Sequence, residues 1–188
     1  MPGNTDIFRQ LFEYIGEDPR RGGLIETPLR AYKAWEEWSS GYAIDPASLL
    51  KTFEDGAEGY DEMVTVTGIP FYSHCEHHLA TIIGVATVAY IPNRRIVGLS
   101  KLARVVDAFA KRLQVQERMC SQIADTIADT LEPVGVGVWL AARHMCMESR
   151  GIAKPGTVTH TTSLRGAIRT EPSARSEFMA LVDRNVRV

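Results

Sequence analysis

Residues 81–91 read Thr-Ile-Ile-Gly-Val-Ala-Thr-Val-Ala-Tyr-Ile, a β-branched run that predicts one long and largely buried strand. Upstream, residues 63–67 alternate apolar and polar side chains, which predicts a second strand. Downstream, residues 134–142 and 143–151 predict two further strands. No strong turn signal separates these two, so a single long strand is the alternative. The middle and later parts of the chain are therefore predicted to build a β-sheet.

Helical patterns around these strands indicate what packs against the sheet. Ser100 is predicted to cap a helix whose apolar stripe ends at Phe109, and residues 115–131 predict a second helix. Residues 151–162, rich in Gly, Pro and Thr, predict a loop, and residues 173–182 predict a short final helix. Strands and helices in this order predict a domain of the α+β class.

The first part of the chain predicts a helical and acidic arm. Apolar residues recur at helical spacing over residues 8–15, and a second helix is predicted over residues 27–38, with Thr as its cap and Pro in its first turn. Residues 52–62 are polar and interrupted by Gly, which predicts a loop. We therefore predict a single domain, residues 1–188, with an N-terminal helical arm over residues 1–62 and a sheet-containing core over residues 63–188.

Composition and charge exclude several classes of protein. The chain has 188 residues, of which 45% are hydrophobic and 23% charged, and this balance excludes disordered, collagen-like and low-complexity proteins. A formal net charge of −2 argues against a dedicated nucleic-acid binder. The charge is uneven, because residues 1–65 carry 6 Lys and Arg against 13 Asp and Glu, whereas residues 66–188 carry 15 against 10. An anionic small-molecule site is therefore expected in the second part.

The sequence predicts a cytoplasmic protein with no membrane partner. Its most apolar segment, residues 79–92, is shorter than the roughly 20 residues of a spanning helix. The first residues lack the charged-then-apolar order of a signal peptide. Three cysteines make a poor disulfide framework and indicate a reducing compartment.

Histidines and cysteines cluster in two windows, His74-Cys75-Glu76-His77-His78 and His144-Met145-Cys146. The spacing Cys75-x-x-His78 lets one turn present sulfur and nitrogen to a single ion. If residues 143–150 form a strand, Cys146 shares a face with His144 and Arg150. We predict a zinc site made by Cys75, His78 and Cys146, with the fourth position left to water as in catalytic zinc sites.

A closed structural zinc site is the alternative, in which His77, His144 or Cys120 supplies a fourth ligand. Cys120 lies in the predicted helix over residues 115–131 and is assigned to packing, and His74 is left outside the site. His77 and His144 are instead predicted to carry protons, because the pKa of a histidine lies near neutrality.

Several motifs together resemble the GTP cyclohydrolase I family, and the resemblance runs in order over nearly the whole chain. The motifs are Gly16–Arg20, Glu26–Arg30, His74–His78, Val97–Lys101, Gln114–Arg118, His144–Cys146 with Arg150-Gly151, Thr161–Leu164 and Arg175–Phe178. His160 departs from the pattern, since a threonine or another small polar residue is expected there.

The resemblance implies a reaction. Zinc on Cys75, His78 and Cys146 activates a water that attacks C8 of the purine ring of GTP. The imidazole ring opens, C8 leaves as formate, and reclosure gives 7,8-dihydroneopterin triphosphate, the first step of pterin and folate biosynthesis. His77 and His144 match the proton-transfer histidines of the family.

The resemblance also implies how GTP is held. Glu117 matches the residue that binds guanine, and a carboxylate accepts from the ring N–H and the exocyclic amine together, a pair that adenine lacks. Alternatively, Glu117 only complements the helix dipole. The remaining predicted substrate residues are Gln116 beside it, Ser100, Lys101, Arg104 and Arg150 on the phosphate side, and Arg30 from a neighbouring subunit.

The family has the tunnelling fold, an antiparallel sheet with two helices packed on it. Subunits join their sheets into a barrel, and a homodecamer of two stacked pentamers forms sites at subunit interfaces. The strand over residues 81–91 fits this expectation, because it needs both faces covered.

Three rival functions are weighed against the cyclohydrolase. A zinc nucleobase deaminase lacks support, because its Pro-Cys-x-x-Cys element is missing and Cys120 and Cys146 lie 26 residues apart. The other two are a nitrile reductase of 7-deazaguanine metabolism, which uses a free cysteine and a nicotinamide cofactor, and a zinc-stabilised binding scaffold without catalysis. Metal content, formate release and NADPH consumption discriminate among them.

Overall fold

The computed structural model describes residues 5–53 and 59–183. The chain forms two compact units, Met1–Ser40 and Gly41–Val188. The loop predicted over residues 52–62 is wrong at its start, where Thr52 and Phe53 form a short strand, and residues 54–58 lie outside the described residues. The division into an arm and a catalytic core near residue 62 stays a prediction. No helix among the described residues is long and apolar enough to cross a membrane.

The first unit contains the two predicted helices, α1 (Asp6–Tyr14) and α2 (Thr27–Trp38). Thr27 lies in the first turn of α2 rather than at its cap, and its hydroxyl donates to the carbonyl oxygen of Gly23 at 3.3 Å. α1 has no buried residue, and its apolar residues Ile7 and Leu11 are exposed. The side of α1 that carries Ile7 and Leu11 is therefore exposed, whereas Phe8 and Phe12 are half-buried.

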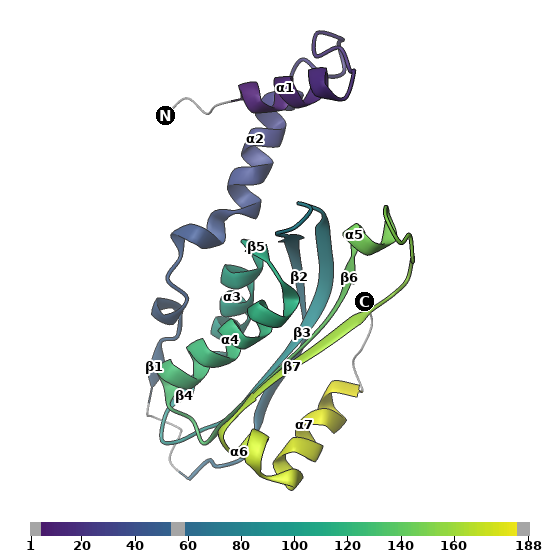
Figure 1. Cartoon of the computed structure of the whole chain (residues 1–188). Coiled ribbons are helices and arrows are strands. Elements are labelled where there is room, and N and C mark those ends of the chain that lie inside the picture. The colour runs from purple at the N-terminus through teal and green to yellow at the C-terminus, as the bar shows by residue number, and fades with distance from the viewer. Residues whose placement is uncertain (1–4, 54–58, 184–188) are drawn as a thin grey trace. The chain divides into compact units, whose positions relative to one another are not determined.

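The second unit is built on a five-stranded sheet in the order β5-β2-β3-β6-β7. All neighbours are antiparallel except β2 and β5, which are parallel. Two short 3-10 helices, η1 (Ser40–Ala43) and η2 (Ala47–Leu49), and a two-stranded sheet of β1 and β4 precede or flank it (Figure 1). The strands are β1 (Thr52–Phe53), β2 (Val64–Cys75), β3 (Thr81–Ile91), β4 (Ile96–Val97), β5 (Leu113–Gln114), β6 (Gly135–His144) and β7 (Thr159–Arg165).

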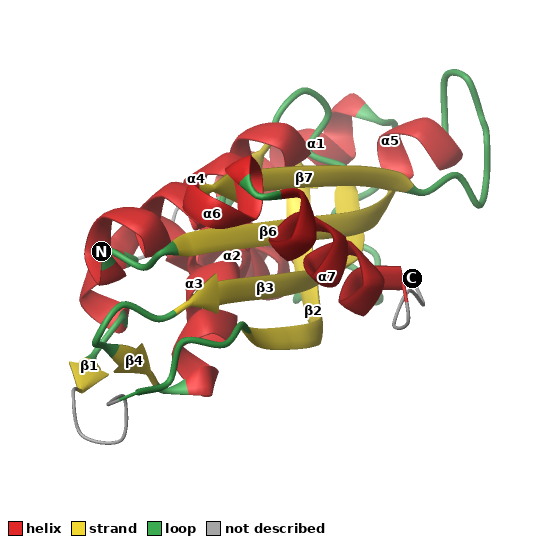
Figure 2. Ribbon diagram, turned by 90° about the horizontal axis from the view of Figure 1, so that it is seen from below, coloured by secondary structure: helices red, strands yellow, loops and turns green. Residues whose placement is uncertain are grey.

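Helices cover both faces of this sheet because its central strands are apolar on both sides. Val88 and Val138 are paired in the register and point into a core shared with α3 (Leu99–Ala110) and α4 (Gln116–Leu131). Their neighbours Ala89 and Trp139 point to the opposite face, where they pack with Phe178. That residue belongs to α7 (Pro172–Asp183), which follows α6 (Gly166–Thr170) (Figure 2). Period-two alternation thus creates two separate apolar clusters.

The predicted strand over residues 143–151 is wrong. β6 ends at His144, and the next residues form the helical turn α5 (Met145–Glu148). Arg143 closes this turn with a bidentate ion pair to Glu148, at 2.8 and 2.6 Å, and the hydroxyl of Ser149 donates to the carbonyl oxygen of Met145. These side-chain contacts override the strand-like pattern of the segment.

Two other expectations need correction. The loop predicted over residues 151–162 ends earlier, because β7 begins at Thr159 and pairs with β6 along the edge of the sheet. Ser100 is not the helix cap: α3 begins at Leu99, and Gly98 occupies the cap position. The predicted helices over residues 115–131 and 173–182 are confirmed within one residue at each end.

Candidate active site

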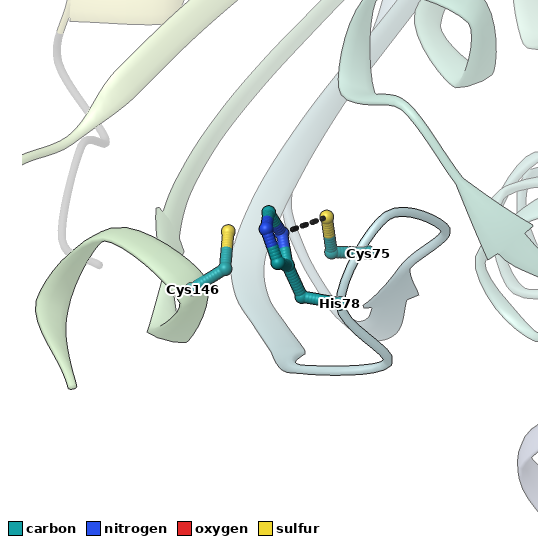
Figure 3. Close-up of side chains that lie close together, drawn as sticks. All are labelled: Cys75, His78 and Cys146. Carbon is teal, nitrogen blue, oxygen red and sulfur yellow. Dashed lines mark hydrogen bonds between the residues drawn. The ribbon is translucent and has the colours of Figure 1, made fainter. Parts of the chain in front are cut away.

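Three side chains with soft ligand atoms converge at one end of the sheet. Cys75 is the last residue of β2, His78 lies in the turn that follows, and Cys146 lies in α5. Their ligand atoms all lie within 4.8 Å of one another, and Cys75 Sγ is 3.8 Å from His78 Nδ1. Figure 3 shows the three side chains close together, with the His78 ring drawn between the sulfur atoms of Cys75 and Cys146. The pairing of Ile82 with His144 in the sheet brings the two sequence windows together.

This donor set fits a divalent metal ion. Burial and the neighbouring Cys75 thiol raise the pKa of Cys146, because two thiolates this close repel each other unless a cation lies between them. Two sulfurs and one imidazole nitrogen are ligands that zinc prefers. Cys146 reaches the group from a helical turn and not from a strand, so the predicted group is present although the backbone argument for it fails.

Cys120 lies apart from this group. Its side chain is buried under the sheet, and its thiol donates to the carbonyl oxygen of Val138 at 3.6 Å. Burial raises the pKa of Cys120 to about 12, so the thiol stays protonated at neutral pH. A protonated core thiol is not a metal ligand, which agrees with its assignment to packing.

His144 is oriented by Gln116. The two side chains meet at 2.7 Å between His144 Nε2 and Gln116 Oε1. The amide nitrogen of Gln116 is 2.9 Å from the carbonyl oxygen of Thr159 and 3.3 Å from that of Leu140, so it is the donor there and Oε1 accepts from the imidazole. His144 therefore carries its proton on Nε2, and Nδ1 is the basic nitrogen. Burial lowers the pKa of His144 and so favours the neutral ring. The negative charge of Glu117 acts in the opposite direction but is the smaller effect.

A cavity of about 140 Å³ joins the metal group to the other predicted residues of the reaction centre. Its lining includes His77, His144 and Glu117 in addition to Cys75, His78 and Cys146. Gln116 also lines it, although its side chain is only 2% exposed and engaged by protein atoms. The structure therefore brings the predicted metal, proton-transfer and base-binding residues into one place.

The predicted phosphate-binding residues are not in this cavity. Ser100, Lys101 and Arg104 lie in the first half of α3, which begins after β4 and ends before β5 (Figure 1). At 1.5 Å per residue, Lys101 is roughly 14 Å along the helix from the end that adjoins the cavity. Arg150 is exposed in the loop after α5, and Lys101, Arg104 and Arg150 form no salt bridge within residues 5–53 and 59–183.

Arg30 and two histidines outside the site complete the set of singled-out residues. Arg30 is exposed on α2 in the first unit, where it forms an ion pair with Glu26. His74 is buried, which lowers its pKa. His160 is exposed on β7, with its ring 5.4 Å from that of Trp139.

A second cavity, of about 330 Å³, lies at the start of α3, and its lining within the described residues holds no metal-ligand group. Its lining is mainly apolar and aromatic and includes Phe53, Tyr90 and Leu99.

Sequence reasoning missed the contact between Glu76 and Arg118 beside the metal group. Glu76 directly follows Cys75 in one motif, and Arg118 directly follows Glu117 in another. This adjacency to predicted site residues is the only sign of the contact in the sequence.

The architecture and the site define a class: an α+β protein with helices on both faces of a five-stranded sheet and a candidate metal centre at one end of that sheet. Sequence comparison gives the family. The model described as GTP cyclohydrolase I matches residues 4–183. The chain belongs to the GTP cyclohydrolase I family, which confirms the predicted family and fold class.

Several relatives match along most of their own length. GTP cyclohydrolase 1 of Janthinobacterium sp. (strain Marseille) is 57% identical over 178 residues, which cover 95% of this chain and 90% of the relative. GTP cyclohydrolase 1 of Nitrosospira multiformis is 53% identical over 176 residues, covering 94% and 92%. GTP cyclohydrolase 1 of Maricaulis maris is 51% identical over 177 residues, covering 94% and 86%.

Proposed function

We propose that this chain is a zinc-dependent GTP cyclohydrolase. It opens the purine ring of GTP at C8, releases formate and forms 7,8-dihydroneopterin triphosphate. The observation that carries the proposal is the cavity in which a Cys-His-Cys group, two histidines and the Glu117 carboxylate meet. Family membership supports the same reaction. Three free cysteines fit a reducing compartment, so we expect the protein in the cytoplasm.

Cys75, His78 and Cys146 would hold the zinc. Three protein ligands leave one coordination position open, and zinc there supplies Lewis-acid activation of the attacking water. The protein's own groups move the protons. His144 accepts the proton of the attacking water at Nδ1, because Nε2 already carries a proton that it donates to Gln116 Oε1. His77, whose Nδ1 is 3.9 Å from Cys75 Sγ, donates a proton to the ring nitrogen that leaves C8.

The base would be bound at the start of α4. Glu117 lies in the first turn of this helix and lines the cavity beside the metal group. Its carboxylate accepts from the ring N–H and the amine of guanine, and this double acceptor discriminates against adenine. The fixed base then places C8 over the metal group, which lowers the entropic cost of the attack.

The triphosphate requires a second copy of the chain. The cavity of about 140 Å³ is smaller than the roughly 300–1,000 Å³ of typical small-molecule sites. The cations proposed for the phosphates, Lys101 and Arg104, lie in the first half of α3, away from the end that adjoins the cavity, and Arg30 belongs to the other unit. We therefore propose that subunits share sites in a homodecamer of two pentameric rings, with their sheets joined into a barrel.

Incubation of zinc-loaded protein with GTP is expected to release one formate per GTP consumed. The product, after oxidation and dephosphorylation, is expected to show neopterin fluorescence, and ATP is expected to give neither signal. Consumption of NADPH in a separate incubation with a 7-deazaguanine nitrile would instead support a nitrile reductase. Zinc-loaded protein that releases no formate from GTP would contradict the proposed activity and favour a binding scaffold.

Shared sites predict complementation between two inactive variants. Arg30→Ala removes a proposed phosphate contact and Cys146→Ala a proposed metal ligand, so each alone is expected to be nearly inactive. Mixed under conditions that exchange subunits, they are expected to regain part of the activity, because some interfaces combine two intact halves. The recovery of activity is measured as formate release from GTP before and after mixing. No recovery despite proven exchange, or full activity of a sedimenting monomer, would contradict shared sites.

A further inference from the structure

The turn that carries the metal ligands is attached to α4 and β5 through Glu76. The backbone N–H of Glu76 donates to the carbonyl oxygen of Gln114 at 3.1 Å. Its carboxylate accepts from Nη2 of Arg118, a residue 42 positions later in the chain. Arg118 also donates to the carbonyl oxygen of Leu113 at 3.3 Å and to the side-chain oxygen of Gln114 at 3.4 Å. A single guanidinium thus joins the turn, β5 and α4.

The rest of this turn has little packing to fix it. The side chains of His77, His78 and Leu79 are exposed. Its backbone is closed by hydrogen bonds at 2.8 Å from Cys75 to Ala80 and from Leu79 back to Cys75, and Leu79 adopts a left-handed φ of 54°. These bonds shape the turn but do not attach it to α4. The contacts of Glu76 do.

The ion pair contributes more to geometry than to global stability. Its two side chains are 45% and 31% exposed, and an ion pair in such surroundings is worth at most about 1 kcal/mol to folding. Its position is informative, however. Glu76 directly follows the ligand Cys75, and Arg118 directly follows Glu117, the proposed base-binding residue. The pair therefore connects the metal half of the cavity to the base half.

We propose that the Glu76–Arg118 ion pair is a positioning contact that sets the metal affinity of the Cys75, His78 and Cys146 group and its spacing from Glu117. This inference rests on the proposed function, since it takes that group to bind zinc. Neither residue of the pair touches the metal in this arrangement. Contacts around metal ligands change metal affinity by about 10–100-fold when they are removed.

Arg118→Met gives a test in which positioning and simple electrostatics have opposite signs. Arg118 is a cation close to a divalent ion, so Coulomb repulsion alone predicts that its removal tightens zinc binding. A positioning role predicts weaker binding, about tenfold at least. The zinc dissociation constant, measured by competition with a chelator at fixed pH, decides between them. The melting temperature of the metal-free variant is expected to stay close to that of the wild-type protein.

Two further variants complete the experiment. Glu76→Gln is expected to weaken zinc binding as well. Arg118→Met also removes the bonds to Leu113 and Gln114, so the double variant Glu76→Gln/Arg118→Met is expected to bind zinc no more weakly than Arg118→Met alone, because the Glu76–Arg118 ion pair is already lost in that single variant. Asp125→Asn is the matched control, since it breaks a comparably exposed ion pair, to Arg165, on the same helix. It is expected to leave zinc affinity unchanged.

The outcomes separate this inference from the proposed function. Unchanged or tighter zinc binding in Arg118→Met, additive losses in the double variant, or an equal loss in Asp125→Asn would overturn the positioning role alone, provided that the wild-type protein binds zinc and converts GTP. A wild-type protein that binds no zinc would overturn both the inference and the proposed zinc chemistry.

Discussion

Cys146→Ala is expected to abolish zinc binding and GTP turnover together. The substitution leaves Cys75 and His78 as ligands, and two protein ligands hold zinc poorly. Turnover falls with the metal, because activation of the attacking water depends on it. Zinc content of the purified variant and formate release from GTP measure the two effects. We expect both to fall to background, the largest effect of any single substitution considered for this chain.

Cys120→Ala is the matched control for Cys146→Ala. It removes the same functional group from a buried position in the core, and it is expected to lower stability while zinc content stays complete. His144→Ala is expected to bind zinc normally but to lose opening of the purine ring, because His144 is proposed to transfer protons and not to bind the metal. Full zinc occupancy in Cys146→Ala would remove Cys146 from the ligand set, and loss of zinc in His144→Ala would make His144 a ligand.

Local spacing in the sequence is enough to predict part of the metal group and part of the sheet. A Cys-x-x-His spacing acts within one turn, so Cys75 and His78 could be placed together without knowledge of the rest of the fold. The β-branched run over residues 81–91 likewise predicts its strand, because its pattern records burial on both faces. Such features depend on neighbours in the chain.

Features that depend on distant contacts could not be predicted in this way. The helical turn α5 is accompanied by an ion pair between Arg143 and Glu148, which are only five residues apart, but the strand-like pattern of this segment gives no sign of it. β7 is an edge strand whose side chains are largely polar, so it lacks the apolar alternation of a buried strand. The inward side chain of Gln116 is set by acceptors on β6 and β7, which only the folded sheet brings near α4.

The division of the predicted site residues also follows from three-dimensional structure. Lys101 and Gln114 are close in the sequence, yet α3 separates the cations near its start from the cavity beyond its end. A motif names residues that act in one site but does not say that one chain supplies them all. The position of these cations is the reason to expect the second subunit.

Glu117→Gln is expected to weaken GTP binding by about 3 kcal/mol, or roughly a hundredfold. The change keeps the size of the side chain but replaces one acceptor oxygen with an NH₂ group that faces the guanine amine. The new NH₂ group and the guanine amine are both hydrogen-bond donors, so the hydrogen bond between them is lost and both groups are left unsatisfied. The KM for GTP and the dissociation constant of a non-reacting GTP analogue are the measurements, and the zinc content is expected to be unchanged.

The competing role of Glu117 predicts a different result. If the carboxylate only complements the dipole of α4, the substitution costs about 0.3–1 kcal/mol of stability and leaves GTP affinity alone. Glu132→Gln, at the other end of the same helix, is the control, because it removes an exposed partner of Arg95 far from the cavity. Equal GTP affinity in Glu117→Gln, Glu132→Gln and the wild-type protein would show that guanine is bound elsewhere. A loss confined to Glu117→Gln, with stability nearly unchanged, assigns the base to this carboxylate.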